Sequence, residues 1–145
     1  MESLLQDFYT DTFIRVAPDC AATTGLVPPT RGGVKTIPLI EYELLSARPY
    51  KLTQHELIFE THVRHKRISP AEVKRRRAAI WEELFRKPHP CMRASMLPKK
   101  YGWGVHYDHQ GRIAIYAVDS AEYARFTQAK SGGPKLLFAM RCQRA

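Results

Sequence analysis

The stretch from Leu97 to Gly104, with Arg93 before it and His106 after it, combines residue types that can bind an anion or transfer a proton. Cations and aromatic rings suit a phosphate, a carboxylate or a stacked base, and a histidine titrates near neutral pH. In an extended strand, residues 102, 104 and 106 share one face, so the two glycines would leave open space beside His106. The candidate ligand-binding residues are Arg93, Lys99, Lys100, Tyr101, Trp103 and His106.

The same stretch also has a purely structural interpretation. Trp103 and Val105 would fill the core while Gly102 and Gly104 admit a neighbouring helix, because glycines in strands serve packing as often as ligand binding. The chain has no glycine-flanked serine elbow, no phosphate-cradling loop before Lys-Ser/Thr and no dinucleotide fingerprint. Catalytic residues therefore stay unassigned, and enzymatic activity stays open.

A second candidate site is the basic segment 64–77, which holds seven Lys/Arg within fourteen residues. Contacts from such a cluster to phosphates give salt-dependent binding without sequence preference. The candidate nucleic-acid-binding residues are Arg64, Lys66, Arg67, Lys74 and Arg75. The alternative is a solvated helix face, because four consecutive helical residues such as Lys74–Arg77 point almost all the way round the helix.

The six histidines and three cysteines do not predict a metal site. A structural zinc needs four ligands with closely spaced cysteine or histidine pairs, and no such cysteine pair occurs. His62 and His65 could share a helix face, but no acidic third ligand stands nearby. We expect no metal and no cofactor.

Local patterns predict the elements that position these residues. Thr12–Ala17 alternates as a first strand, and residues 36–47 place apolar side chains on one helical stripe. Further helices are expected from Thr53, with a Thr53/Glu56 capping box, and from Ser69 to Lys87, with a Ser69/Glu72 box and a stop at Pro88.

The second half of the chain changes to an alternating pattern. It predicts strands at 91–97, 102–108 and 112–118, a turn in which Gly111 takes a positive φ, a short helix after residue 119 or 120, and a buried last strand at 136–140. Strands that follow helices favour an antiparallel sheet. The expected fold is α+β, one domain over residues 1–145, with about five strands and about four helices in the order β-ααα-βββ-α-β.

Composition limits the class of protein, and the distribution of charge shows where its electrostatic field is strongest. The net charge is +9, and residues 51–100 carry it, with 13 Lys/Arg against 5 Asp/Glu. No apolar run approaches a membrane span, no leader pattern precedes the domain, and the scattered cysteines suit free thiols. We expect a cytoplasmic protein that does not enter the membrane.

The segments 32–37, 42–45, 48–51 and 93–106 together resemble a family of short microbial proteins known only as a domain of unknown function. The Leu-Pro-Lys-Lys-Tyr-Gly-Trp-Gly block is the most specific part, and the resemblance extends from about Asp11 to Arg141. It implies no activity, cofactor or site residue. The run Lys74–Arg77 lies outside the resembling segments.

Three functional hypotheses follow. The first is a binding module for an anionic partner, either nucleic acid or a phosphorylated ligand, because positive charge is the only global feature that departs from the average. The second is a small-molecule-binding protein or enzyme with its site in the 93–106 turn. The third is a protein-interaction subunit.

Overall fold

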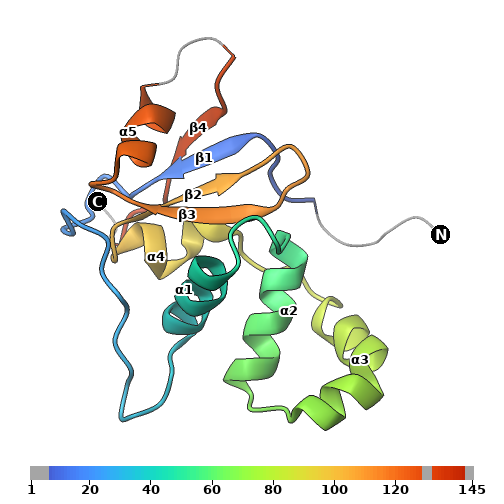
Figure 1. Cartoon of the computed structure of the whole chain (residues 1–145). Helices are drawn as coiled ribbons and strands as arrows, with labels where there is room; N and C mark the ends of the chain where they lie inside the picture. Colours follow the sequence, from blue (N-terminus) through green and yellow to red (C-terminus); the bar gives the residue numbers. More distant parts are fainter. Residues whose placement is uncertain (1–6, 129–131, 143–145) are drawn as a thin grey trace.

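The computed structural model describes residues 7–128 and 132–142, and it places helices on both faces of one mixed sheet (Figure 1). The strands are β1 (Thr12–Arg15), β2 (Trp103–Tyr107), β3 (Ile113–Ala117) and β4 (Lys135–Phe138), in the spatial order β3-β2-β1-β4. The β1–β4 pair is parallel and the other two pairs are antiparallel. The helices are α1 (Ile37–Ala47), α2 (Gln54–His65), α3 (Pro70–Leu84), α4 (Met96–Lys99) and α5 (Ala121–Thr127), with a 3₁₀ turn at Met92–Ala94.

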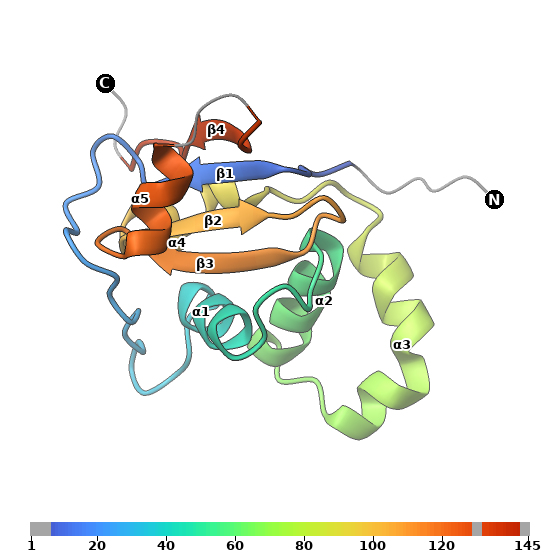
Figure 2. The same ribbon diagram turned by 45° about the horizontal axis from the view of Figure 1, so that its top comes forward.

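Alternation along the strands divides the sheet into two faces. One face is covered by α1, α2 and α4, and α5 lies alone on the other (Figure 2). The main core lies between the sheet and the first group of helices. Its fully buried side chains include Ile14, Val105, Tyr107, Leu45 and Leu97. Each such aliphatic side chain stabilises the fold by about 1.5–3 kcal/mol through burial.

The helix starts follow the predicted capping chemistry. Thr36 Oγ1 accepts from the Leu39 backbone N–H at 3.4 Å, and both halves of the Thr53/Glu56 capping box are present. At α3, Ser69 Oγ accepts from the Glu72 N–H at 3.1 Å, but Glu72 pairs with Arg76 at 3.1 Å and the reciprocal bond of a box is not formed. The predicted starts are therefore confirmed, and the second capping box is only half made.

The predicted strand at 91–97 is wrong, because this segment forms the 3₁₀ turn and α4. Ser95 caps α4 by accepting from the Leu97 N–H at 3.1 Å, and Met92 and Leu97 both enter the core. The described sheet accordingly has four strands rather than about five, within the α+β class that the patterns predict.

Two other predictions, one on a helix end and one on burial, differ from the structure. The third helix ends at Leu84, not Lys87, since the His89 ring lies within hydrogen-bonding distance of the Leu84 carbonyl, with Nε2 to O at 2.7 Å. The last strand is not well buried: β4 forms a sheet edge, with Lys135 and Phe138 exposed. The predicted turn after β2 is confirmed, with Gly111 at φ 78°.

The α2–α3 pair extends away from the sheet (Figures 1 and 2), and it has its own apolar cluster. The cluster is built from Phe59, Val63, Ile80 and Leu84. Inside α3, Arg76 leaves helical geometry with φ −120° and ψ 22°, so the helix is kinked in the middle of its basic run. The directions of Lys74 and Arg77 are therefore not those of a straight helix.

The cysteines are Cys20, Cys91 and Cys142, and all three are free, as their spacing predicts. In the described part of the chain, no helix has the length and apolar character that crossing a membrane requires.

Candidate functional site

The six ligand-binding candidates of the 93–106 stretch do not converge on one site. Trp103 lies on the face of the sheet that α1, α2 and α4 cover, and its Nε1 donates to the Leu26 carbonyl at 2.8 Å. His106 lies on the opposite face, against α5. Arg93 Nε donates to the Phe138 carbonyl at 2.9 Å. Lys99 lies in α4, and the Lys100 ammonium lies 5.7 Å from the centroid of the Tyr101 ring. The first site hypothesis thus has no common surface for its cations and His106.

The space expected beside Gly102 and Gly104 is filled by the protein itself. A Cβ on Gly104 would lie 2.5 Å from Phe13 Cζ and 2.6 Å from Tyr123 Cε2. At Gly102, where φ is +79°, a Cβ would lie 2.2 Å from the Thr24 carbonyl oxygen. Both glycines therefore admit close packing, which is the structural interpretation of the pattern.

His106 is instead part of a hydrogen-bonded relay with two tyrosines. The Tyr50 hydroxyl lies 2.7 Å from His106 Nδ1 and 2.8 Å from the Tyr116 hydroxyl. A tyrosine hydroxyl has one proton, so when Tyr50 donates to His106 it accepts from Tyr116. Burial lowers the pKa of His106, against the opposing effect of Asp108 and Asp11, and this favours the neutral imidazole.

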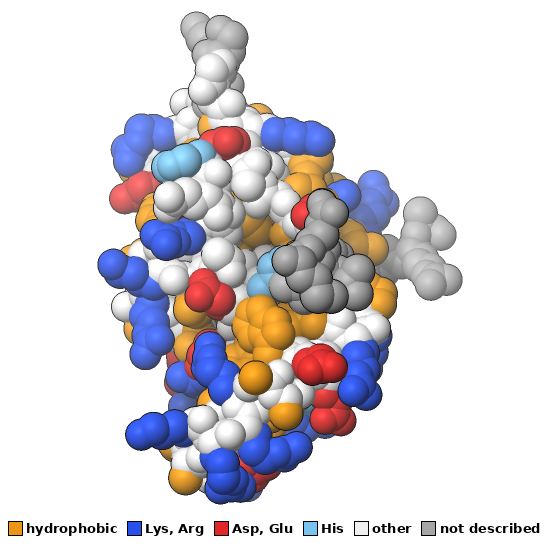
Figure 3. All heavy atoms as spheres, turned by 90° about the vertical axis from the view of Figure 1, so that its right-hand side faces the viewer, with side chains coloured by type: hydrophobic (Ala, Val, Ile, Leu, Met, Phe, Trp, Pro, Cys, Tyr) orange, Lys and Arg blue, Asp and Glu red, His pale blue; other side chains and the backbone are white. Residues whose placement is uncertain are grey.

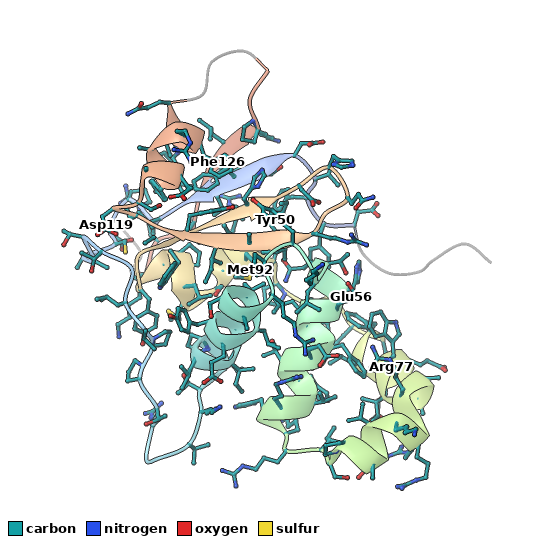
Figure 4. The ribbon with its side chains drawn as sticks, in the orientation of Figure 1. Tyr50, Glu56, Arg77, Met92, Asp119 and Phe126 are labelled. Carbon is teal, nitrogen blue, oxygen red and sulfur yellow. The ribbon has the colours of Figure 1, made fainter. Side chains whose placement is uncertain are left out.

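Aromatic rings enclose the relay on the α5 side of the sheet. The Phe126 ring centroid lies 4.3 Å from that of His106, and the Phe13 centroid lies at 6.4 Å. Tyr50 reaches the relay from the α1–α2 connection at the edge of β3, and Figure 4 labels it together with Phe126. Sequence reasoning missed Tyr50 and Phe126, since no local pattern links either residue to β2.

A second titratable group missed by sequence reasoning lies between α1 and α4. Ser95 Oγ donates to Glu41 Oε1 at 2.8 Å, and burial raises the pKa of the Glu41 carboxyl to about 7. The hydrogen bond from Ser95 opposes this rise. The Glu41 carboxyl of the folded protein, with a pKa of about 7, is thus mainly neutral below that pH.

The basic segment contributes to a groove of about 1060 Å³ between the 31–34 turn, α1, α2 and the first half of α3. Its lining includes the cations Lys35, Arg64, Arg67, Lys74 and Arg77 and the acids Glu43 and Glu60. Of the nucleic-acid-binding candidates, Arg64, Arg67 and Lys74 line it, and Lys66 and Arg75 do not. Figure 3 shows Lys and Arg side chains gathered at the lower end of the molecule, where α2 joins α3.

The groove cations differ in their partners. Glu60 is only 21% exposed, and its two carboxylate oxygens face Arg64 from the same helix and Arg77 from α3. The Arg77 guanidinium also lies 4.4 Å from the centroid of the Phe59 ring, and Figure 4 labels it on α3. Lys35 pairs with Glu43 at 2.9 Å. No ion pair of Arg67 or Lys74 occurs among the described residues.

Metal ligands do not assemble in the described part of the chain, where no group of three or more His, Cys, Asp or Glu side chains could hold an ion. His62 and His65 stand on α2 without an acidic third ligand of this kind.

Comparison with known proteins gives a family but assigns no activity. A model of a family of unknown function, DUF6157, matches residues 5–145. The chain therefore belongs to this family. No curated protein and no solved structure matches it.

Replacing His106 by Ala tests whether the relay is structural. The change removes the partner of Tyr50 and the ring that packs on Phe126, and we expect it to lower the free energy of unfolding by about 1–3 kcal/mol. Urea denaturation of H106A beside W103A measures this, because truncating Trp103 sets the scale of a large loss. If H106A were as stable as the wild type, His106 would have no structural role, and the hypothesis that it faces a ligand would stand again.

Replacing Glu41 by Gln tests the raised pKa. Its folded-state pKa of about 7 lies above the ordinary 4.5, so the stability that Glu41 contributes is full below pH 4.5 and is lost as the pH rises through 7. We expect E41Q to be more stable than the wild type at pH 8, by on the order of 2 kcal/mol, and no more stable at pH 4.5. E43Q, which alters an exposed carboxylate on the same helix, should not raise the stability at pH 8, because it removes the ion pair with Lys35.

Proposed function

We propose that this protein is a non-enzymatic binding module for an anionic partner, with the groove between the 31–34 turn, α1, α2 and α3 as its site. The observation that carries the proposal is the convergence of four cations from α2, α3 and the turn between them on one concave surface. Arg64 and Arg67 come from α2 and the turn after it, and Lys74 and Arg77 come from α3. Convergent cations in a cleft strengthen the local field and raise encounter rates with anions.

Part of this cationic surface is already ordered. Glu60 fixes the Arg64 and Arg77 guanidinium groups, and Phe59 supports Arg77 from below. Guanidinium groups held in place lose less side-chain entropy when they bind a phosphate or carboxylate. Arg67 and Lys74 supply the charge that a ligand would neutralise.

Among the described residues, the lining has no hydroxyl that is free to act as a nucleophile. Its one hydroxyl of nucleophilic type, on Ser69, is used to cap α3. The partner would be a nucleic acid or a phosphorylated small molecule, and both present phosphate to the same cations. A cytoplasmic location, where thiols stay reduced, would suit the three free cysteines.

Reversing two groove charges tests the site. R67E/K74E removes the cations without an acidic partner, so we expect it to weaken binding of tripolyphosphate and of a fluorescein-labelled oligonucleotide at least about tenfold at low salt. K66E/R75E is the matched control, because it makes the same change of net charge in the same segments outside the groove.

Calorimetry and fluorescence anisotropy at two salt concentrations measure these affinities. Wild-type binding should weaken as salt rises, since released counterions contribute to affinity. Equal losses in the two double variants would show that overall charge, and not the groove, binds the anion.

Replacing Glu60 by Gln tests the role of the internal carboxylate. Glu60 holds Arg64 and Arg77 in place but also neutralises part of their charge. A Gln amide oxygen can still accept from a guanidinium without that charge, so we expect E60Q to bind tripolyphosphate several-fold more tightly than the wild type. E72Q is the control, because Glu72 pairs with Arg76, which does not line the groove. Equal gains in E60Q and E72Q would contradict the competition, because both changes remove one negative charge.

A further inference from the structure

The floor of the groove is apolar, and the contacts between its cations and an anion do not involve this surface. Five aliphatic side chains line it, and among the described residues its one aromatic ring is the imidazole of His65; the five are Val34, Ile40, Val63, Ile68 and Val73. Ile40 and Val63 are almost fully buried at the base, whereas Val34 is 45% exposed at the rim. The groove is therefore aliphatic below and cationic around its edge.

Val34 is held at the rim by a tight two-residue turn. The Arg31 and Val34 backbones pair in both directions, at 2.8 and 3.0 Å. Between them, Gly32 and Gly33 have φ of 58° and 76°, values that favour glycine at both central positions. The turn places the Val34 side chain and Lys35 in the lining of the groove.

This combination discriminates among anions. Single-stranded nucleic acid is bound by stacking successive bases on several aromatic rings, and the described groove lining offers one, that of His65. Contacts to a duplex backbone require only cations and leave an aliphatic floor in water. A molecule with an anionic head and a hydrocarbon chain satisfies both surfaces at once.

We propose that the groove binds a soluble single-chain amphiphile, whose anionic head contacts Arg67 and Lys74 and whose aliphatic chain lies on the Val63–Ile68–Val73 floor. This inference rests on the proposed function, because it names the class of anion that the same cations bind. A groove of about 1060 Å³ has room for such a chain, since small-molecule sites commonly enclose about 300–1,000 Å³. Each methylene that leaves water should raise the affinity up to about fourfold.

A series of alkyl phosphates tests the chain directly. Titration calorimetry with inorganic phosphate and with butyl, hexyl and octyl phosphate, all below their micelle-forming concentrations, should show affinity rising with chain length. Octanoate should bind as an amphiphile with a different head, and neutral octanol should bind more weakly than octyl phosphate. The same affinity for phosphate and octyl phosphate would overturn the inference.

Two variants separate the floor from the cations. V34S/V73S should reduce the advantage of octyl phosphate over inorganic phosphate about tenfold or more, and it should leave the affinity for inorganic phosphate unchanged. V73S alone changes a partly buried residue of the proposed floor and should lower the same advantage, so it keeps the test available if the double variant does not fold. V27S is the control, because Val27 is 60% exposed and does not line the groove.

The outcomes distinguish this inference from the proposed function. If R67E/K74E weakens tripolyphosphate binding but chain length has no effect, the anion site stands and the amphiphile is wrong. Tight binding of the oligonucleotide with no effect of chain length would assign the groove to nucleic acid instead. If no anion binds the wild-type protein, both proposals fail.

Discussion

The α2–α3 pair brings two guanidinium groups of like charge close together, and this arrangement depends on an anion between them. Arg64 and Arg77 would repel each other if no anion lay between them, and Glu60 supplies that anion from within α2. The carboxylate is mostly buried, so its attraction to both guanidinium groups is less screened than in an exposed pair. The apolar cluster around Phe59 and Val63 packs the helices together on the same side. The groove and its charge therefore have one structural origin.

The sheet imposes a second constraint, because each strand separates its neighbouring residues onto opposite faces. Trp103 and His106 lie three residues apart on β2 and thus serve different layers. Gly104 lets Phe13 and Tyr123 approach the α5 face, which closes the space that a ligand would need. The relay through Tyr50 then satisfies the Nδ1 atom of a half-buried histidine. On this side of the molecule, polar chemistry serves the packing of α5 and the α1–α2 connection.

Sequence reasoning succeeded where the determinants are local and failed where they are distant. Thr36, Thr53 and Ser69 cap their helices through backbone groups three residues away, so the helix starts were predictable. Segment 91–97 alternates like a strand, but Met92 and Leu97 are buried by elements far away in the chain, and Ser95 is engaged by Glu41 on α1. The Tyr50–His106 contact joins residues 56 positions apart. No periodicity within one segment encodes such a contact, and the same holds for a groove assembled from four segments.

The basic run Lys74–Arg77 is divided between the groove and the exposed side of α3. On a straight helix, Lys74 to Arg77 would be distributed around the axis, and the run would be an ordinary solvated face. In the folded chain, Lys74 and Arg77 line the groove, three positions apart on opposite sides of the non-helical Arg76. Arg76 pairs with Glu72, and Arg75 does not reach the groove. Half of the run is thus available to a ligand and half is not. Positions 74 and 77 share a face even on a straight helix, so the division could be found only once the segments that border this face were known.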